Sequence, residues 1–321
     1  MNDQLFHGYN CFATAVGQHL INIKKYKAME TVVLRWTFDC NKCWISENVW
    51  SVGTCVEAAD YLLQYDLEKL EGIKISESKE ESFQKSLEIA QKRISEFGSH
   101  VVLVDFYYLK SIDWKRMERF GYFPKHLPHF ICITQVNDSE ATYQDPMYKF
   151  CGKISISELE VAQKLNVCGV EHVGTYYDFD FKNYQNKYTF ENKIEYQLKR
   201  YLKNQQFKAI AKFAIALSDN LDTFFNKSNM EWAFNFYLAL ESVPLQRQNF
   251  MLAIREQYPE CSKMIMKLIM DWIKIRKKFH QLYNQKDINV LRDIIDSLNE
   301  ISIQEEIVPE KLLERLQNDK K

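Results

Sequence analysis

Glycine is confined to one part of this chain, and this distribution constrains the fold more than any other feature of the sequence. All nine glycines lie between Gly8 and Gly174, and none occurs in the rest of the 321 residues. Because glycine weakens helix interiors and marks turns, its absence favours long uninterrupted helices after Gly174. We therefore expect an α+β domain over residues 1–185, followed by an all-helical domain over residues 186–321.

Runs rich in Val, Ile, Phe and Tyr predict the strands of the first domain, at residues 31–38, 101–108, 129–136 and 141–144. The stretch 68–96 is instead charged and helical in its pattern. From about Phe190 onward amphipathic helical spacing predominates. We expect these helices to break near Pro244, Pro259 and Pro309.

Composition and charge exclude several classes of protein. The formal net charge of −1 argues against nucleic acid as the main partner, since nucleic-acid-binding domains usually carry a strong basic excess. No basic segment followed by an apolar run opens the chain, and no run of about 18 apolar residues occurs in it. We therefore expect a cytoplasmic protein with no membrane partner, whose eight cysteines are reduced.

Two of these cysteines, Cys40 and Cys43, have the spacing of half a zinc site. A second ligand pair with comparable spacing is missing, so Cys55 and a distant histidine would have to complete four ligands. We therefore expect no metal site, with Cys40 and Cys43 as free thiols in or near the core; structural zinc is the alternative.

Cys11 is the first candidate for chemistry. Apolar residues recur at helical spacing after it, and Gly8 and Asn10 before it tolerate tight backbone conformations. This pattern predicts that Cys11 lies in the first turn of a buried helix, where unpaired amides and the helix dipole favour a thiolate. The alternative is that Cys11 is a small buried apolar residue with no chemical role.

The second candidate is a predicted β-hairpin in which His129 begins one strand and Asp145 ends the next. Residues 137–139, Asn-Asp-Ser, are suited to the turn between the strands. An antiparallel hairpin brings those two strand ends side by side, within reach of a hydrogen bond. Pro146 favours an extended backbone at Asp145, which limits where the carboxylate can point. A surface ion pair is the alternative interpretation.

Together, Cys11, His129 and Asp145 have the roles of a nucleophile, a base and a residue that orients the base. Their order along the chain resembles that of papain-like cysteine enzymes, and more narrowly the double-glycine-leader peptidases of bacteriocin export. The sequence is most similar to the amino-terminal domain of the butirosin-biosynthesis acyltransferase family. The segments that carry this similarity are residues 9–15, 129–131, 145–146 and 154–162, the last with an expected helix-capping box from Ser157 to Glu160.

The resemblance implies a papain-like catalytic domain and a reaction typical of antibiotic and nonribosomal peptide biosynthesis. An acyl or aminoacyl group would leave a carrier-protein phosphopantetheine thioester, join Cys11, and pass to a small-molecule amine. The enzyme would need no cofactor of its own. The papain-type signature around the nucleophile is missing. A cysteine peptidase or amide hydrolase of the leader-peptidase type is the alternative, and a non-catalytic interaction protein with this fold is a third interpretation.

The residue that stabilises the oxyanion is less clearly indicated. Leader peptidases of this fold place a glutamine one residue nearer the nucleophile than Gln4 stands here, and His7 lies between Gln4 and Cys11. Gln4 is therefore the first candidate and His7 the second. The backbone amide of Cys11 would contribute in either case.

The helical domain contains a basic segment between Cys261 and Lys278 in which only Asp271 is acidic. An apolar stripe at helical spacing shares this segment, which predicts a helix that is anchored on one side and positive on the other. We expect this face either to be ordinary solvated surface or to dock an acidic acyl or peptidyl carrier protein. Its basic residues are Lys263, Lys267, Lys274, Arg276, Lys277 and Lys278.

Overall fold

The computed structural model of the chain describes residues 5–39, 60–119, 126–164, 166–167, 170–171, 174–226 and 230–318. These residues form a mixed α+β fold, as expected, and divide into two compact units. The sheet unit comprises Met1–Val32 and Leu63–Lys187, and the helical unit comprises Val33–Leu62 and Tyr188–Lys321. The boundary between Lys187 and Tyr188 lies close to the expected boundary at 185/186. The segment 33–62, which we expected in the first domain, groups with the helical unit.

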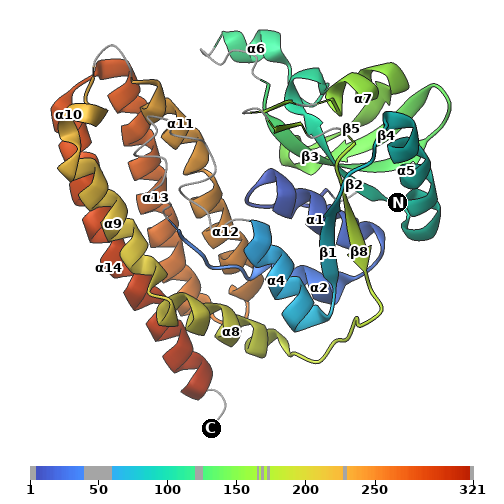
Figure 1. The fold of residues 1–321 in the computed structure, drawn as a ribbon. Helices are drawn as coiled ribbons and strands as arrows, with labels where there is room; N and C mark the ends of the chain where they lie inside the picture. The colour runs from blue at the N-terminus through green and yellow to red at the C-terminus, as the bar shows by residue number, and fades with distance from the viewer. Residues whose placement is uncertain are drawn as a thin grey trace. The chain divides into compact units, whose positions relative to one another are not determined.

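An antiparallel sheet forms the centre of the sheet unit (Figure 1). Among the described residues it has six strands in the order β1-β8-β2-β3-β4-β5. A separate pair of short strands, β6 and β7, follows α7 in the chain. The strands are β1 (Lys74–Ser78), β2 (His100–Asp105), β3 (Pro128–Val136), β4 (Glu140–Asp145), β5 (Phe150–Ser155), β6 (Asn166–Val167), β7 (Val170–Glu171) and β8 (Tyr176–Asp180).

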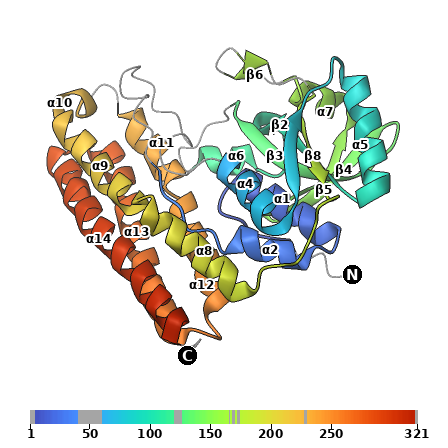
Figure 2. The ribbon, with the colours of Figure 1, turned by 60° about the horizontal axis from the view of Figure 1, so that its bottom comes forward.

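Helices cover both faces of the sheet. Alternate side chains of a strand point to opposite faces, so neighbouring residues of β3 pack on different helices. Cys132 of β3 faces α1, where its thiol donates to the carbonyl of Ala15 at 3.0 Å. Ile131 and Ile133 pack instead in a buried cluster with α7, and side chains of α5 lie against that cluster. Figure 2 shows the ribbons of α5 and α7 beside the strands of the sheet. The helices and 3-10 turns of this part of the chain are α1 (Cys11–Asn22), α2 (Tyr26–Val33), α4 (Asp60–Glu71), α5 (Phe83–Phe97), η1 (Phe106–Tyr108), α6 (Trp114–Glu118), η2 (Pro146–Tyr148) and α7 (Ile156–Ala162).

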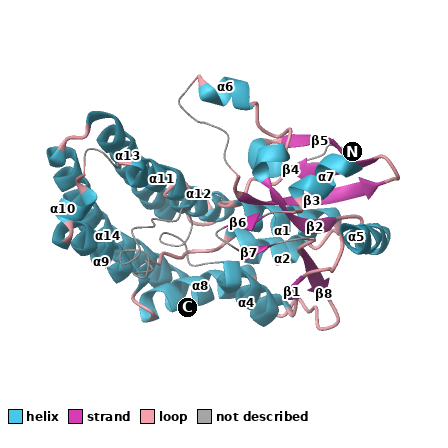
Figure 3. Ribbon diagram, turned by 45° about the horizontal axis from the view of Figure 1, so that its top comes forward, coloured by secondary structure: helices cyan, strands magenta, loops and turns pink. Residues whose placement is uncertain are grey.

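The described part of the helical unit contains helices and no strand (Figure 3). The last helix, α14, packs along α8, α9 and α13, and α13 packs in turn on α11 and α12. None of the described helices combines the length and the apolar character needed to cross a bilayer. The helices are α8 (Phe190–Lys203), α9 (Gln206–Asp219), α10 (Leu221–Phe224), α11 (Glu231–Ala239), α12 (Ser242–Ile254), α13 (Pro259–Gln285) and α14 (Ile288–Asn318).

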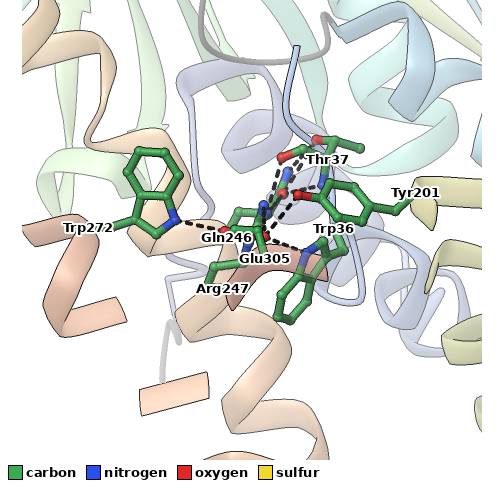
Figure 4. A network of polar contacts seen from close by, with 7 residues as sticks. All are labelled: Trp36, Thr37, Tyr201, Gln246, Arg247, Trp272 and Glu305. Atoms are coloured by element: carbon green, nitrogen blue, oxygen red, sulfur yellow. Dashed lines mark hydrogen bonds and ion pairs between the residues drawn. The ribbon is translucent and has the colours of Figure 1, made fainter. Parts of the chain in front are cut away.

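A buried carboxylate, Glu305 of α14, organises the core of the helical unit (Figure 4). Arg247 of α12 donates to both of its oxygens, at 3.0 Å each. The side chains of Trp36 and Tyr201 donate to Oε2 at 2.9 and 3.0 Å, and that of Trp272 donates to Oε1 at 2.7 Å. Five hydrogen bonds from four side chains thus compensate for the loss of water around the charge.

Two strand predictions and one helix prediction differ from the structure. Residues 31–33 are the end of α2, and 34–39 form no strand; Leu34, Trp36 and Phe38 are instead buried in the helical core. In the stretch 68–96, predicted to be helical, Gly72 ends a helix with φ of 70° and β1 follows. The predicted strand 101–108 ends at Asp105, because Asp105 caps the turn η1.

Two expectations about helix boundaries also fail. The capping box of α7 joins Ser155 to Glu158, two residues before the predicted box, because Ser-x-x-Glu occurs twice in succession there. Helix α14 continues through Pro309, although proline costs a helix interior about 3 kcal/mol. Buried apolar side chains on both sides of Pro309 hold the helix together, among them Val308 and Leu312.

Candidate active site

Local contacts fix Cys11 as the first residue of α1, as the sequence predicts. Asn10 is the N-cap, and its side-chain oxygen accepts from the amide of Ala13 at 2.7 Å. The Thr14 hydroxyl donates to the Asn10 carbonyl at 2.6 Å. Gly8 packs so closely on this turn that an added Cβ would lie 2.4 Å from the Thr14 hydroxyl oxygen, so only glycine fits. The turn before α1 is therefore held rigidly on both sides of Cys11.

The predicted hairpin is also confirmed. Strands β3 and β4 pair antiparallel, and the Asn137 side chain accepts from the amides of Ser139 and Glu140 to close the turn. At the open end of the hairpin, His129 Nε2 lies 3.0 Å from Asp145 Oδ2. The histidine that begins the first strand and the carboxylate that ends the second thus form a hydrogen bond, as predicted.

Burial and charge together set the protonation of this pair. The side chains of His129 and Asp145 are 6% and 1% exposed. Burial alone lowers the pKa of His129, but the charge and hydrogen bond of Asp145, and then the hydrogen bond and charge of Cys11, outweigh burial and raise that pKa from 6.5 to about 10. The contacts with Asp145 and Cys11 therefore favour the charged form of His129. The structure brings Cys11, His129 and Asp145 together.

The two ring nitrogens of His129 have separate partners. Nε2 meets Asp145, which leaves Nδ1 as the nitrogen available to the Cys11 side chain. Among the described residues no donor reaches the other carboxylate oxygen, Asp145 Oδ1, which is also buried. This arrangement can hold a thiolate nucleophile and deliver a proton beside it.

Two aromatic rings next to His129 were not identified as part of the site from the sequence. The ring of Phe106 lies 4.6 Å from that of His129, and the ring of Tyr148 lies 5.7 Å from it. Phe106 and Tyr148 also stack on one another at 5.1 Å. Tyr148 follows the Asp145-Pro146 motif closely in the sequence, and this proximity could have identified it as part of the site. The rings give the histidine an apolar surround.

The other described cysteines are placed differently from Cys11. Cys132 is fully buried against α1, and burial raises the pKa of its thiol. Cys151 is exposed on β5, and Cys261 is buried in α13. The remaining cysteines lie outside the described residues: Cys40, Cys43, Cys55 and Cys168. The predictions about zinc and free thiols at Cys40 and Cys43 therefore stay predictions, and the residues that are described contain no cluster of three metal ligands.

The structure describes two of the three oxyanion candidates, His7 and the amide of Cys11. Gln4, the first candidate, lies outside the described residues. His7, the second, is exposed ahead of α1. The amide of Cys11 belongs to the first helical turn, where N–H groups have no acceptor within the helix. Of the three predicted donors, the Cys11 amide is the one whose position the structure fixes at the nucleophile.

The basic residues of α13 divide into two groups. Lys263, Lys267, Lys274 and Lys277, which we call the α13 lysine row, are exposed. Two of them form surface ion pairs, Lys263 with Glu260 and Lys274 with Asp271. Arg276 instead packs on the ring of Tyr237 at 4.2 Å, and Lys278 donates to the Ser297 hydroxyl at 2.9 Å. Of the predicted apolar stripe, Met264 is partly buried and the other five residues are buried: Ile265, Leu268, Ile269, Trp272 and Ile275.

Comparison of the sequence with protein families and curated proteins identifies no relative. No protein-family model matches the chain, and no curated protein matches its sequence. The resemblance to the butirosin-biosynthesis acyltransferases therefore stays a prediction. The case for a function rests on the arrangement of Cys11, His129 and Asp145.

Proposed function

We propose that this protein is a cysteine-dependent acyltransferase whose sheet unit is a papain-like catalytic domain. The observation that carries the proposal is the buried His129–Asp145 pair beside Cys11 at the start of α1. The donor is an acyl or aminoacyl thioester on the phosphopantetheine arm of a carrier protein, and the acceptor is a small-molecule amine. The thioester arrives already activated, so the reaction needs no cofactor held by the enzyme.

The first half-reaction forms an acyl-enzyme. The Cys11 thiolate attacks the thioester carbonyl carbon, and the amide of Cys11 donates to the oxyanion that develops there. The C–S bond to the carrier arm then breaks, and His129 gives its proton to the departing thiolate. Asp145 holds the ring of His129 in place throughout.

The second half-reaction restores the enzyme. An unprotonated amine attacks the carbonyl carbon of acyl-Cys11, and the C–S bond to Cys11 breaks. The proton lost by the amine nitrogen returns to His129, so that the amide product leaves and the thiolate–imidazolium pair is regenerated. No oxidant or reductant takes part.

The apolar surround of His129 favours transfer to an amine over hydrolysis. Phe106 and Tyr148 pack beside a histidine side chain that is only 6% exposed. A site that excludes water slows the loss of a reactive acyl intermediate before the acceptor arrives. The same three residues in a wetter site would serve a peptidase or amide hydrolase.

We further propose that the α13 lysine row receives the carrier protein. Carrier proteins are acidic, and complementary charge mainly increases the rate of encounter. Because Lys263 and Lys274 are partly neutralised by neighbouring carboxylates, the contribution of this row should be modest and sensitive to salt.

Intact-protein mass spectrometry tests the proposed function. Wild type and Cys11→Ala are incubated with a panel of acyl-phosphopantetheinyl carrier proteins and with acyl-N-acetylcysteamine thioesters. Wild type should gain the mass of one acyl group, located on Cys11 by peptide mapping, and an added amine should remove it as the amide. Acylation of Cys11→Ala to the same extent would overturn the assignment. Release to water at the same rate with and without amine would favour the hydrolase.

A further inference from the structure

A second histidine–carboxylate pair lies at the same end of the sheet as His129 and has no part in the reaction described so far. His126 Nδ1 is 2.6 Å from Asp105 Oδ2. The other oxygen of Asp105 accepts from the amide of Tyr107 at 3.0 Å. The carboxylate is thus fixed by the backbone of η1 while it holds the histidine.

The pairing of β2 with β3 places the two histidine pairs at the same end of these strands, at successive positions of the register. Val104 lies opposite His129 in this register, and Asp105 lies opposite Pro128. The pairing continues past the strand, where the amide of Phe106 donates to the carbonyl of Leu127. His126 and His129 therefore emerge from one end of the same pair of strands.

The turn η1 contacts both histidines with successive aromatic rings. Phe106 lies against the ring of His129 at 4.6 Å, and Tyr107 stacks on the ring of His126 at 4.4 Å. Asp105, which begins this turn, orients His126. One short segment thus sets the positions of both rings.

The two pairs differ in their access to solvent. The side chain of His126 is 57% exposed over a carboxylate that is 6% exposed, whereas His129 is itself buried. A buried pair suits the nucleophile, while an exposed pair at the same end of the strands is open to molecules in solution. Tyr107, which stacks on His126, and Tyr148, which lies beside His129, are each about two-fifths exposed.

We propose that His126 is a second catalytic base, which takes a proton from the acceptor amine, and that Asp105 is its positioning residue. The inference rests on the proposed function, because His129 there serves the Cys11 thiolate and returns to the imidazolium form. The acceptor class this implies is a primary amine that is protonated in solution. An ammonium ion has no lone pair and cannot attack a thioester, so one group must deprotonate it first.

The proton balance of the second half-reaction is then complete. The unprotonated His126 accepts one proton from the ammonium group, which becomes a neutral amine. The amine nitrogen bonds to the acyl carbon, the C–S bond to Cys11 breaks, and the nitrogen gives its second proton to His129. His126 releases its proton to solvent, to which it is exposed.

The experiment measures the two half-reactions separately and compares two acceptors. Acyl-Cys11 is formed from acyl-N-acetylcysteamine, its formation is timed by mass spectrometry, and ethanolamine or hydroxylamine is then added near neutral pH. Ethanolamine is protonated there, whereas hydroxylamine is largely neutral and needs no base to remove a first proton. The variants are His126→Gln and Asp105→Asn, whose amide oxygen can still accept from Tyr107. The matched control is His280→Gln, a histidine that lies beside the ring of Tyr237 and meets Asn284 in place of a carboxylate.

In His126→Gln, acyl-Cys11 should form at the wild-type rate, while transfer to ethanolamine slows by about 10²-fold or more. The rate of transfer to hydroxylamine should change less than about threefold, because hydroxylamine is already neutral and a general base has no first proton to remove from it. Asp105→Asn should show the same dependence on acceptor with a smaller loss, and His280→Gln should match wild type. Equal losses with both acceptors, or no loss with either, would overturn the role of His126 while leaving the proposed function intact. Failure of wild type to form acyl-Cys11 would instead refute the proposed function, and the inference with it.

Discussion

Replacing Glu305 with glutamine should strongly destabilise the helical unit. The two carboxylate oxygens accept five hydrogen bonds from Trp36, Tyr201, Arg247 and Trp272. Glutamine keeps one acceptor oxygen and places an NH₂ group where the other stood. Donors that met the lost oxygen then face another donor, and the buried guanidinium of Arg247 loses its counter-charge.

The expected magnitude follows from those lost contacts. Removing one partner of a buried ion pair costs about 3–5 kcal/mol, because the other charge stays buried and uncompensated. Hydrogen bonds to charged groups contribute about 1.5–3 kcal/mol each, so the loss of two such bonds gives a similar cost in the free energy of unfolding. For a unit of this size the midpoint of thermal unfolding should fall by roughly 6–20 °C.

Urea unfolding followed by far-UV circular dichroism measures this change. Glu310→Gln is the matched control, since Glu310 is exposed on the same helix, and it should change the free energy of unfolding by less than about 0.5 kcal/mol. In the double variant Arg247→Met/Glu305→Gln the uncompensated charge is gone, so its loss should be smaller than the sum of the single losses. A cost below about 1 kcal/mol for Glu305→Gln, or strictly additive losses in the double variant, would refute this reasoning.

Three further predictions concern the site, the buried histidines and the α13 lysine row. In His129→Ala, iodoacetamide should alkylate Cys11 at least about tenfold more slowly than in wild type at pH 6, since the imidazolium that stabilises the thiolate is lost; equal rates would exclude the pairing. Burial lowers the pKa of His19 to about 3, and burial together with smaller electrostatic contributions from His19 and Arg93 lowers the pKa of His100 to about 3. The unfolded chain therefore binds more protons below pH 6.5, and the free energy of unfolding should fall by about 1.4 kcal/mol per pH unit for each histidine as the pH drops from 6.5 toward 3. His129 has the opposite sign: its contribution is complete below pH 6.5 and is lost as the pH rises toward 10. Urea titrations across this range give the free energy of unfolding at each pH, and this free energy should fall less steeply with decreasing pH in His100→Gln than in wild type. Equal slopes in the two proteins would show that His100 does not titrate on unfolding. Reversing Lys267, Lys274 and Lys277 to Glu should slow reaction with a carrier-bound thioester about tenfold or more at low salt, with a smaller effect at high salt, and should spare acyl-N-acetylcysteamine; equal losses with both donors would exclude carrier docking.

The parts of the site that the sequence predicted are those encoded by neighbouring residues. Asn10 caps the helix that begins at Cys11, and Asn137 closes the hairpin that joins His129 to Asp145, each through contacts only a few residues away. Such local signals can be read from one sequence because residue type and spacing determine them.

The parts that were missed depend on contacts between distant segments. Strand β1 pairs with β8, so Lys74 lies opposite Asp180, and the local charged pattern gave no sign of that partner. The alternating apolar residues of 34–38 did indicate an extended backbone, yet helices from the other end of the chain surround them in place of a sheet. Phe106 reaches His129 only because β2 pairs with β3. Tertiary context decided each of these cases.

The placement of Trp36 in the helical unit has a consequence for synthesis on the ribosome. Trp36 is made 269 residues before Glu305, its hydrogen-bond partner. At about 5–20 residues per second, that interval lasts roughly 15–55 seconds. Meanwhile the last strand of the six-stranded sheet, β8, has already been made, so the sheet can close first. Leu34, Trp36 and Phe38 lack the partners that bury them until the helices of the helical unit have been made, and apolar surface that is exposed in this way is prone to aggregation.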